Sequence, residues 1–238
     1  MIKVEAHCHT GASGCADTPI EILAKRYKEA GYGGIVVTNH ISEYEFYKKH
    51  EGTTAKEKKE YFINVYNESK KVINSYGLKT FFSCEVSVKS DIHSEFILYG
   101  VTPEIINKYE PLFSYTQKEL FEIANIENMF MYKTHPFRTY EYAGDPKFMH
   151  GAEVFNGHFK QENNNPLAKA FCEGNGLIAM SGTDFHHQNQ PITGGIYLPK
   201  DINTELELRD YVKAGNLKLI ADYEKFEEIR KLVLEGKM

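Results

Sequence analysis

Histidine, aspartate and glutamate residues recur just after short apolar runs in this sequence. Each run has the β-branched and aromatic residues typical of a strand, and five such runs follow one another along the chain. Imidazole and carboxylate groups that gather in one place are the ligands of zinc, iron and manganese. The runs precede, in order, His7 and His9, then Asn39 and His40, then Glu85, then His135, then Asp184 and His186. This recurrence predicts a site for more than one divalent metal ion.

Helix signals separate the strand runs from one another. Capping boxes begin at Thr116 and Thr204, and Thr18 followed by Pro19 predicts a third helix start. Strands that alternate with helices favour a parallel sheet, and about six to eight such units favour a closed barrel. We therefore expect one α/β barrel domain over residues 1–238, with the candidate ligands at the C-terminal rim of its strands. An open, doubly wound sheet is the alternative, because it also places ligands at strand ends.

Composition narrows the classes of protein that fit the chain. Its 238 residues carry a net charge of −5 with both signs mixed, so no basic surface indicates general nucleic-acid binding. No apolar run reaches the ~20 residues of a membrane span, and no signal peptide follows Met1, so we expect a cytoplasmic protein. The four cysteines form no CxxC pair and are expected to be reduced thiols: Cys8, Cys15, Cys84 and Cys172.

His7 and His9 form the first specific motif. Residues i and i+2 of a strand project to the same face, so both imidazoles can bind one metal ion or two adjacent ions. An HxH pair is a weak signal by itself. It is strengthened by three later motifs, which are Thr38-Asn39-His40, Thr134-His135-Pro136 and Gly182-Thr183-Asp184-Phe185-His186.

Together these motifs resemble those of the PHP family, named for its polymerase and histidinol-phosphatase members, and in particular its stand-alone histidinol-phosphatase-like members. The family pattern is an HxH at the first strand, T-D-H at the second, an isolated Glu, a later S/T-H-P and a final G-[ST]-D-x-H. The match runs from near residue 1 to about residue 190. The resemblance implies a distorted (β/α)7 barrel, two or three divalent metal ions (Zn, Fe or Mn) at its C-terminal rim, and hydrolysis of phosphate esters.

Carried over residue by residue, the resemblance also implies which side chains bind the ions. Glu85 would bridge two ions, and His135 would complete that half of the site. The implied ligands of the binuclear pair are His7, His9, Glu85 and Asp184, and those of a further ion are His40 and His186.

The chain departs from the family pattern in three places. Family members usually have Asp or His shortly after the HxH, where this chain offers Cys15 or Asp17, and a thiolate suits Zn or Fe better than Mn. Asn39 stands where Asp is common, which removes a negative charge next to the ligands. Many members carry a His at the fourth strand, whereas here His93 lies upstream of it, either as a displaced ligand or as a surface residue.

Three further polar residues are candidates for contact with a substrate. Arg138 follows His135 by three residues, and a guanidinium offers a bidentate fork to a phosphoryl group. The alternative is a surface arginine paired with an acid such as Glu141. Asn156 and His158 lie at the end of a predicted strand, where His158 can assist at the leaving group and Asn156 can bind the substrate.

The sequence therefore favours hydrolysis of a small phosphomonoester, histidinol-phosphate-like or another phosphorylated metabolite, by metal-activated hydroxide. Two metal ions ~3.5–4 Å apart generate hydroxide near neutral pH and bind the phosphoryl oxygens. A phosphodiesterase or exonuclease acting on nucleotides or short nucleic acid is one alternative, favoured by an open groove with stacking aromatics. A non-catalytic metal-binding scaffold is the other. Residues 41–60 follow a candidate ligand and form either a lid or a solvated loop.

Overall fold

The chain folds around one strongly curved sheet with helices outside it. In the computed structural model, residues 1–48 and 54–237 are described. Strands and helices alternate along the chain as the sequence predicted, so the mixed α/β class is confirmed. The strands are β1 (Ile2–Cys8), β2 (Tyr32–Val37), β3 (His40–Ile41), β4 (Lys79–Ser87), β5 (Glu95–Tyr99), β6 (Phe130–Lys133), β7 (Gly151–Asn156), β8 (Ile178–Gly182), β9 (Gly194–Leu198) and β10 (Lys218–Ala221).

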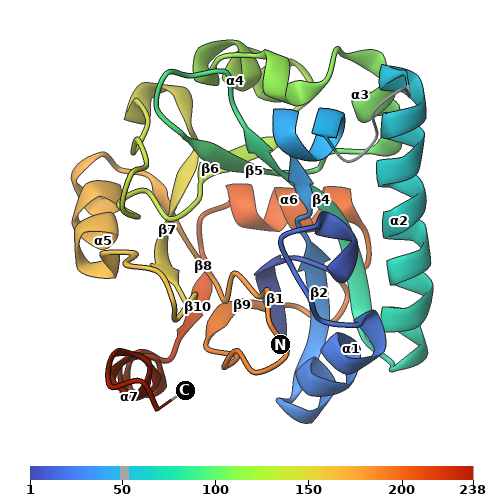
Figure 1. Cartoon of the computed structure of the whole chain (residues 1–238). Helices are drawn as coiled ribbons and strands as arrows, with labels where there is room; N and C mark the ends of the chain where they lie inside the picture. Colours follow the sequence, from blue (N-terminus) through green and yellow to red (C-terminus); the bar gives the residue numbers. More distant parts are fainter. Residues whose placement is uncertain (49–53, 238) are drawn as a thin grey trace.

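The helices lie around this sheet (Figure 1). They are α1 (Ile20–Glu29), α2 (Ala55–Ser75), α3 (Pro103–Lys108), α4 (Gln117–Ile126), α5 (Asn165–Gly174), α6 (Glu205–Lys213) and α7 (Tyr223–Leu234). Short 3-10 or π turns add η1 (Gly11–Ser13), η2 (Tyr44–Lys48), η3 (Leu112–Ser114) and η4 (Pro146–Phe148). None of the helices in the described parts of the chain has the length and apolar character needed to cross a membrane.

The sheet nearly closes into a barrel. Nine strands form one path in the order β10-β9-β1-β2-β4-β5-β6-β7-β8, and β3 pairs with β4 beside this path. The end of β1 meets the segment that follows β8, because Cys8 bridges Phe185 and the backbone N–H of His9 donates to the carbonyl of Phe185 at 3.1 Å. A barrel-like sheet rather than an open, doubly wound sheet is therefore observed.

The expectation of a purely parallel sheet is wrong for two strands, β5 and β9. β5 is antiparallel to β4 and β6, β9 is antiparallel to β1, and β10 is antiparallel to β9. Only residues 88–94 join β4 to β5, and a parallel pair would need a crossover of a dozen or more residues. Because β5 is reversed, its N-terminal end lies at the rim where β4 ends, with Glu95 paired to Ser87.

Helix α6 covers the opposite end of the barrel from that rim. Its Leu208 and Val212 pack into the apolar interior beside Phe81 of β4 and Ile97 of β5. The carboxylate of Glu205, at the start of α6, accepts a hydrogen bond from the backbone N–H of Phe82 at 3.1 Å. One end of the barrel is therefore closed by apolar packing, and the polar side chains gather at the other.

Most predicted helix boundaries are confirmed. The capping boxes at Thr116 and Thr204 form as expected and begin α4 and α6. The helix start predicted after Thr18 is found one residue later than expected, because α1 begins at Ile20 with Pro19, and not Thr18, at its cap and without a side-chain cap hydrogen bond. The Thr18 hydroxyl instead donates to the backbone carbonyl of His186 at 3.4 Å. The segment predicted to be either a lid or a solvated loop spans residues 41–60, of which 49–53 lie outside the described residues.

Candidate metal centre

A bulge in β1 turns the two histidines of the HxH motif into the barrel. Val4 and Ala6 face the apolar interior, so strict alternation would send His7 outward. The pairing with β2 shifts between Glu5 and Cys8, and a bulge of this kind re-aims the side chains that follow it. The carboxylate of Glu5 holds the bulge by accepting the backbone N–H groups of Ala6 and His7, each at 2.9 Å.

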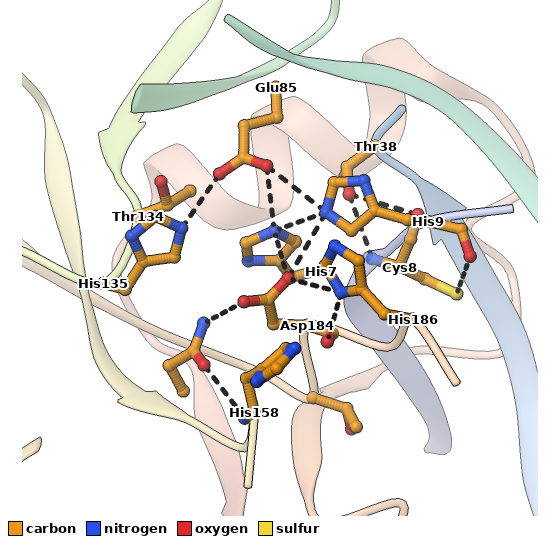
Figure 2. Close-up of polar contacts among 12 residues, drawn as sticks. His7, Cys8, His9, Thr38, Glu85, Thr134, His135, His158, Asp184 and His186 are labelled. Atoms are coloured by element: carbon orange, nitrogen blue, oxygen red, sulfur yellow. Dashed lines mark hydrogen bonds and ion pairs between the residues drawn. The ribbon is translucent and has the colours of Figure 1, made fainter. Parts of the chain in front are cut away.

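His7 and His9 meet two carboxylates at the rim (Figure 2). The Nε2 atoms of the two rings are 3.1 Å apart. Each Nε2 lies 3.3 Å from Oε2 of Glu85 and 3.3 Å from Oδ1 of Asp184. All four side chains are buried. β1, β4 and the segment after β8 therefore bring four of the predicted ligands together.

Glu85 contacts two further imidazoles. Its Oε2 lies 3.3 Å from Nδ1 of His40, and its Oε1 lies 3.3 Å from Nε2 of His135. His40 Nδ1 is also 3.3 Å from Oε1 of Glu95, at the start of the reversed strand β5. Glu85 thus lies close to imidazoles on both sides of the cluster.

His135 is held from behind by a buried ion pair. Its Nδ1 lies 2.8 Å from Oε1 of Glu141, whose Oε2 lies 2.9 Å from Nζ of Lys133. The Lys133 side chain is 0% exposed. A carboxylate behind a ligating imidazole fixes the ring orientation. Glu141 therefore orients His135, and it is not the partner of Arg138 that the alternative reading suggested.

Replacing Lys133 by methionine is expected to lower the free energy of unfolding by up to about 3–5 kcal/mol, because the buried Glu141 carboxylate would lose its lysine and keep the His135 ring as its partner. Chemical denaturation of the purified variant measures this loss. Adding Glu141→Gln to the same variant removes the stranded charge and should recover part of the stability. Unchanged stability in Lys133→Met would show that the pair does not support the His135 side of the site.

Asp184 is held on its second oxygen by Arg138. Nη2 of Arg138 lies 2.5 Å from Oδ2 of Asp184 and 3.1 Å from Oδ1 of Asn156, and its Nε donates to Asn163 at 2.9 Å. Among the described residues, none of these hydrogen bonds uses Nη1. Asp184 has a φ of +52°, in the left-handed region that few residues other than Gly, Asn and Asp adopt easily.

A second bulge, in β7, places Asn156 beside Asp184. The pairing of β7 with β8 shifts between Glu153 and Phe155. One carboxylate oxygen of Glu153 lies 3.1 Å from Nδ1 of His7. The other oxygen accepts a hydrogen bond from the backbone N–H of His135 at 3.0 Å. The side-chain amide of Asn156 donates to Asp184 Oδ2 at 3.2 Å.

His158 follows on the same rim, with its ring centroid 5.1 Å from that of His186. Burial lowers the pKa of His158 to about 3, with His186 and Arg138 adding to the effect of burial. His158 is therefore neutral near pH 7. A neutral imidazole there can exchange hydrogen bonds, but it holds little of the proton that a general acid needs.

Cys15, His9, His40 and His186 form the third side of the cluster. Their candidate ligand atoms all lie within 4.8 Å of one another. Of the two residues proposed for this position, the structure brings Cys15 to the cluster and leaves Asp17 outside. The Asp17 side chain is 66% exposed and pairs with His187 at 2.9 Å.

His93 lies at the edge of the cluster. Its Nε2 is 3.2 Å from Oε2 of Glu95, and its side chain is 53% exposed. His93 was predicted to be either a displaced ligand or a surface residue. In the structure it is about half exposed, and it also contacts Glu95, whose carboxylate faces His40 and His135.

The cluster attracts positive charge. Burial would raise the pKa of Glu85 and of Asp184, but His7 and the other cations around them hold both values well below the ordinary range. Burial would lower the pKa of His9, but Cys15 and Asp184 raise it to about 10. Burial would raise the pKa of Cys15, but His9, His186 and His40 outweigh this effect and lower it to about 2. Anionic ligands and imidazoles thus share a volume that a divalent cation would neutralise.

The spacing of the donor atoms fits bound metal ions. Ligands ~2.0–2.1 Å from one ion at tetrahedral angles are about 3.3 Å from each other, which is the separation that recurs here. Buried atoms that include Glu85 Oε1 and His40 Nδ1 face opposite charges without a hydrogen bond of normal geometry among the described residues. Donor chemistry, burial and spacing therefore all suit divalent metals.

Glu95, Glu141 and Glu153 were not selected from the sequence as site residues. Glu95 is the first residue of β5, and only the reversal of that strand brings it to the rim. Glu153 lies inside β7, and the bulge beside it breaks the alternation that would have predicted its direction. Glu95 and Glu153 could have been identified from the sequence by searching for carboxylates on either side of an apolar strand run, and not only after it.

A cleft of about 850 Å³ opens beside the cluster. Cys15, His40, His93 and Glu95 form its floor on the metal side. Its other walls come from the segment around η2, from the end of β4 and the loop that follows it, and from η3. The lining residues there include Ser42, Tyr44, Ser87, Lys89, Ser90 and Ser114. The cleft gives a substrate access to the Cys15–His40 side of the cluster.

No protein-family model matches the sequence, and no curated protein matches it. Several solved structures share its fold. A two-domain protein from Bacteroides vulgatus containing a predicted PHP-like metal-dependent phosphoesterase matches with a TM-score of 0.64 and 16% identity, over 96% of this chain and 68% of that one. PsfC from Pseudomonas syringae matches with a TM-score of 0.67 and 13% identity, over 100% and 99%. The lesion-specific endonuclease EndoQ from Pyrococcus furiosus matches with a TM-score of 0.57 and 17% identity, over 92% of this chain and 57% of that one. At these identities the similarity establishes the fold.

Proposed function

We propose that the chain is a metal-dependent phosphoesterase of the PHP family that hydrolyses a small phosphomonoester. The observation that carries this proposal is the convergence of His7, His9, Glu85 and Asp184 at one rim of the barrel, where each Nε2 lies 3.3 Å from an oxygen of both carboxylates. Two neighbouring folds belong to proteins named as a phosphoesterase and an endonuclease, which agrees with phosphate-ester chemistry.

The proposal includes the fold that the resemblance implied. The strands β1, β2, β4, β5, β6, β7 and β8 would be the seven strands of a distorted (β/α)7 barrel in a single domain over residues 1–238, with β9 and β10 added at its edge. The histidinol-phosphatase-like subtype is supported by the order and spacing of the motifs alone.

The residues divide into two roles in this proposal. Two or three divalent ions (Zn, Fe or Mn), when bound, would supply hydroxide and Lewis-acid stabilisation of the phosphoryl group. The residues that would hold them are His7, His9, Cys15, His40, Glu85, His135, Asp184 and His186, with Glu95 as an added carboxylate. Arg138, Asn156 and His158 flank Asp184, where they would bind and orient the phosphoryl group by hydrogen bonds.

A phosphodiester substrate is the second candidate, and aromatic residues near the rim favour it. Tyr44 lines the cleft and is 59% exposed. Tyr140 and Tyr142, in the loop that follows His135 and Arg138, are also exposed. Exposed aromatic rings near a phosphate-binding site suit the stacking of nucleobases. The net charge of −5 gives little attraction for a long polyanion, so a nucleotide or a short strand fits better.

Parallel assays on p-nitrophenyl phosphate and bis-p-nitrophenyl phosphate test the proposal. The protein would be stripped of metal, reloaded with Zn, Mn or Fe, and assayed beside elemental analysis. Metal-restored release of nitrophenol from the monoester is expected. Preference for the diester would instead support the second candidate. Bound metal without hydrolysis of either ester, or of a panel of phosphorylated metabolites, would favour the non-catalytic scaffold.

Arg138→Ala is expected to lower kcat/KM for the monoester about ten- to a hundredfold, the effect of losing one charge-assisted contact. The motivation is the Nη1 atom, which takes no part in the hydrogen bonds that Arg138 makes to Asp184, Asn156 and Asn163 in the described part of the chain and can donate to a phosphoryl oxygen. Arg138→Lys should rescue only part of the loss, because an ammonium lacks the fork.

Metal content measured on the same Arg138→Ala sample separates two roles. Metal at the parent level with reduced turnover supports contact with the substrate. Loss of metal with the activity would instead mean that Arg138 acts by orienting Asp184. Unchanged kinetics across several phosphorylated substrates would remove Arg138 from the site.

A further inference from the structure

The metal cluster has one side that differs in chemistry from the rest. Cys15 and His186 group with His9 and His40, and no carboxylate belongs to that group. The three other groups that contain His7 or His40 each include at least one carboxylate, from Glu85, Asp184 or Glu95. Among the described residues, Cys15 and His186 belong to the sulfur-containing group alone. The cluster therefore offers a sulfur–nitrogen position beside carboxylate–nitrogen positions.

The segment that carries Cys15 is fixed to the other ligand-bearing segments on both sides. Upstream of Cys15, the Thr10 backbone N–H donates to Oδ1 of Asn39 at 2.9 Å, next to His40. Downstream of it, the Asp17 backbone N–H donates to the carbonyl of His186 at 3.0 Å.

Ser13 completes this anchoring, since its Oγ accepts both the thiol of Cys15 and the backbone N–H of His40 at 3.3 Å. The thiol thus has a defined position facing the imidazoles. A chance surface cysteine would not be anchored in this way.

We propose that Cys15 selects Zn²⁺ as a thiolate-bound ion on its side of the cluster, while the carboxylate positions around Glu85 and Asp184 take Mn²⁺, so that the chain holds a mixed-metal centre. Thiolate favours zinc, and carboxylate with water favours manganese. His9 and His40 lie between the two kinds of position and can each serve one ion. With Cys15 and His186, either ring gives zinc at least three protein ligands. This inference rests on the proposed metal centre and adds which ion each position takes.

Cobalt substitution reads the thiolate directly. The full-length protein, stripped of metal and titrated with Co²⁺, is expected to show a sulfur-to-cobalt charge-transfer absorption in the near ultraviolet. Cys15→Ser and Cys15→Asp should lose that absorption while still binding cobalt. Cys172→Ser is the matched control, because Cys172 lies on α5 among apolar residues and should keep the parent spectrum.

Competition measures the selectivity. The stripped protein is given one equivalent of Zn²⁺ with excess Mn²⁺ and analysed for both elements after desalting. The parent should retain about one zinc together with manganese. Cys15→Asp should reduce the preference for zinc over manganese by at least ~tenfold, because its oxygen donor favours manganese more than sulfur does.

The outcomes separate this inference from the proposed function. Cobalt bound by the parent without the charge-transfer absorption, or an absorption that persists in Cys15→Ser, overturns the thiolate position. Failure of the parent to bind any metal overturns the metal centre and this inference together. The absorption in a protein that hydrolyses no phosphate ester supports the mixed-metal position and contradicts only the proposed function. The parent spectrum decides these cases even if a Cys15 variant fails to fold.

Discussion

Replacement of Asp184 by asparagine is expected to abolish hydrolysis and to lower the metal content of the protein, while the fold is kept. Oδ1 of Asp184 lies 3.3 Å from His7, His9 and His186, so one oxygen serves three imidazoles. An amide would remove the negative charge from that position. A loss of metal-based stabilisation worth ~4 kcal/mol or more corresponds to about a thousandfold or greater loss of rate.

Asparagine is the sharper replacement at this position. The φ of +52° at Asp184 is tolerated by asparagine and strained for alanine, so Asp184→Asn separates the loss of a ligand from backbone strain. Elemental analysis, circular dichroism and turnover on one sample measure the effect. Asp17→Asn is the matched control, because Asp17 is exposed and pairs with His187 at the edge of the site. Full activity and full metal content in Asp184→Asn would show that the final motif does not hold metal.

Removal of the metal ions should eliminate activity and also change how stability depends on pH. Ions bound at a hundred- to a thousandfold excess over Kd stabilise a fold by about 3–4 kcal/mol each. In a chain of this size, the loss of one such ion should lower the melting temperature by about 5–15 °C. Readdition of metal should restore both the activity and the melting temperature.

The pH dependence of the metal-free protein follows from the shifted histidines. The pKa of His9 is raised to about 10, and those of His7, His40 and His135 are raised as well. A raised pKa in the folded state gives stability that is full below the unfolded value of ~6.5 and is lost as pH rises through the folded value. Cys15, whose pKa is lowered to about 2, acts in the opposite direction and offsets one of these histidines.

The metal-free protein should therefore lose stability as pH rises from about 6.5 toward 10. Acid should destabilise it too, because Glu85 and Asp184 have pKa values held well below their ordinary range and lose their stabilising charge as pH falls through those values. Melting curves of the metal-free and metal-loaded forms between about pH 2 and about pH 10 measure both the acid and the alkaline loss of stability. A metal-free form whose stability rises steadily through this alkaline range would contradict the charge arrangement described for the cluster.

The sequence predicted the residue types that gather at the site better than the contacts between them. His7, His9, His40, His135, Asp184 and His186 follow apolar runs and were all found at one rim, because parallel strands bring their C-terminal ends together. Glu95 could not be found in this way. It begins β5, and nothing in the local pattern of that strand shows that the strand runs against its neighbours.

The bulges in β1 and β7 were also invisible to sequence patterns. Strict alternation along β1 would have pointed the His7 side chain to the face opposite Val4 and Ala6. The bulge between Glu5 and Cys8, which the Glu5 carboxylate stabilises, turns His7 into the barrel instead. Arg138 was selected for its distance from His135, yet its main contact is Asp184, 46 positions away along the chain. Contacts of that range depend on how the barrel closes, which no local spacing records.

Anomalous diffraction from crystals of the protein grown with Zn²⁺ and Mn²⁺ tests the central claim most directly. The account predicts at least two anomalous peaks at the rim, each within ~2–2.3 Å of donor atoms from the cluster. One peak should touch Glu85 together with His7 or His135, and another should touch His186. An active, metal-dependent enzyme whose anomalous peaks lie away from His7, His9, Glu85 and Asp184 would contradict the account.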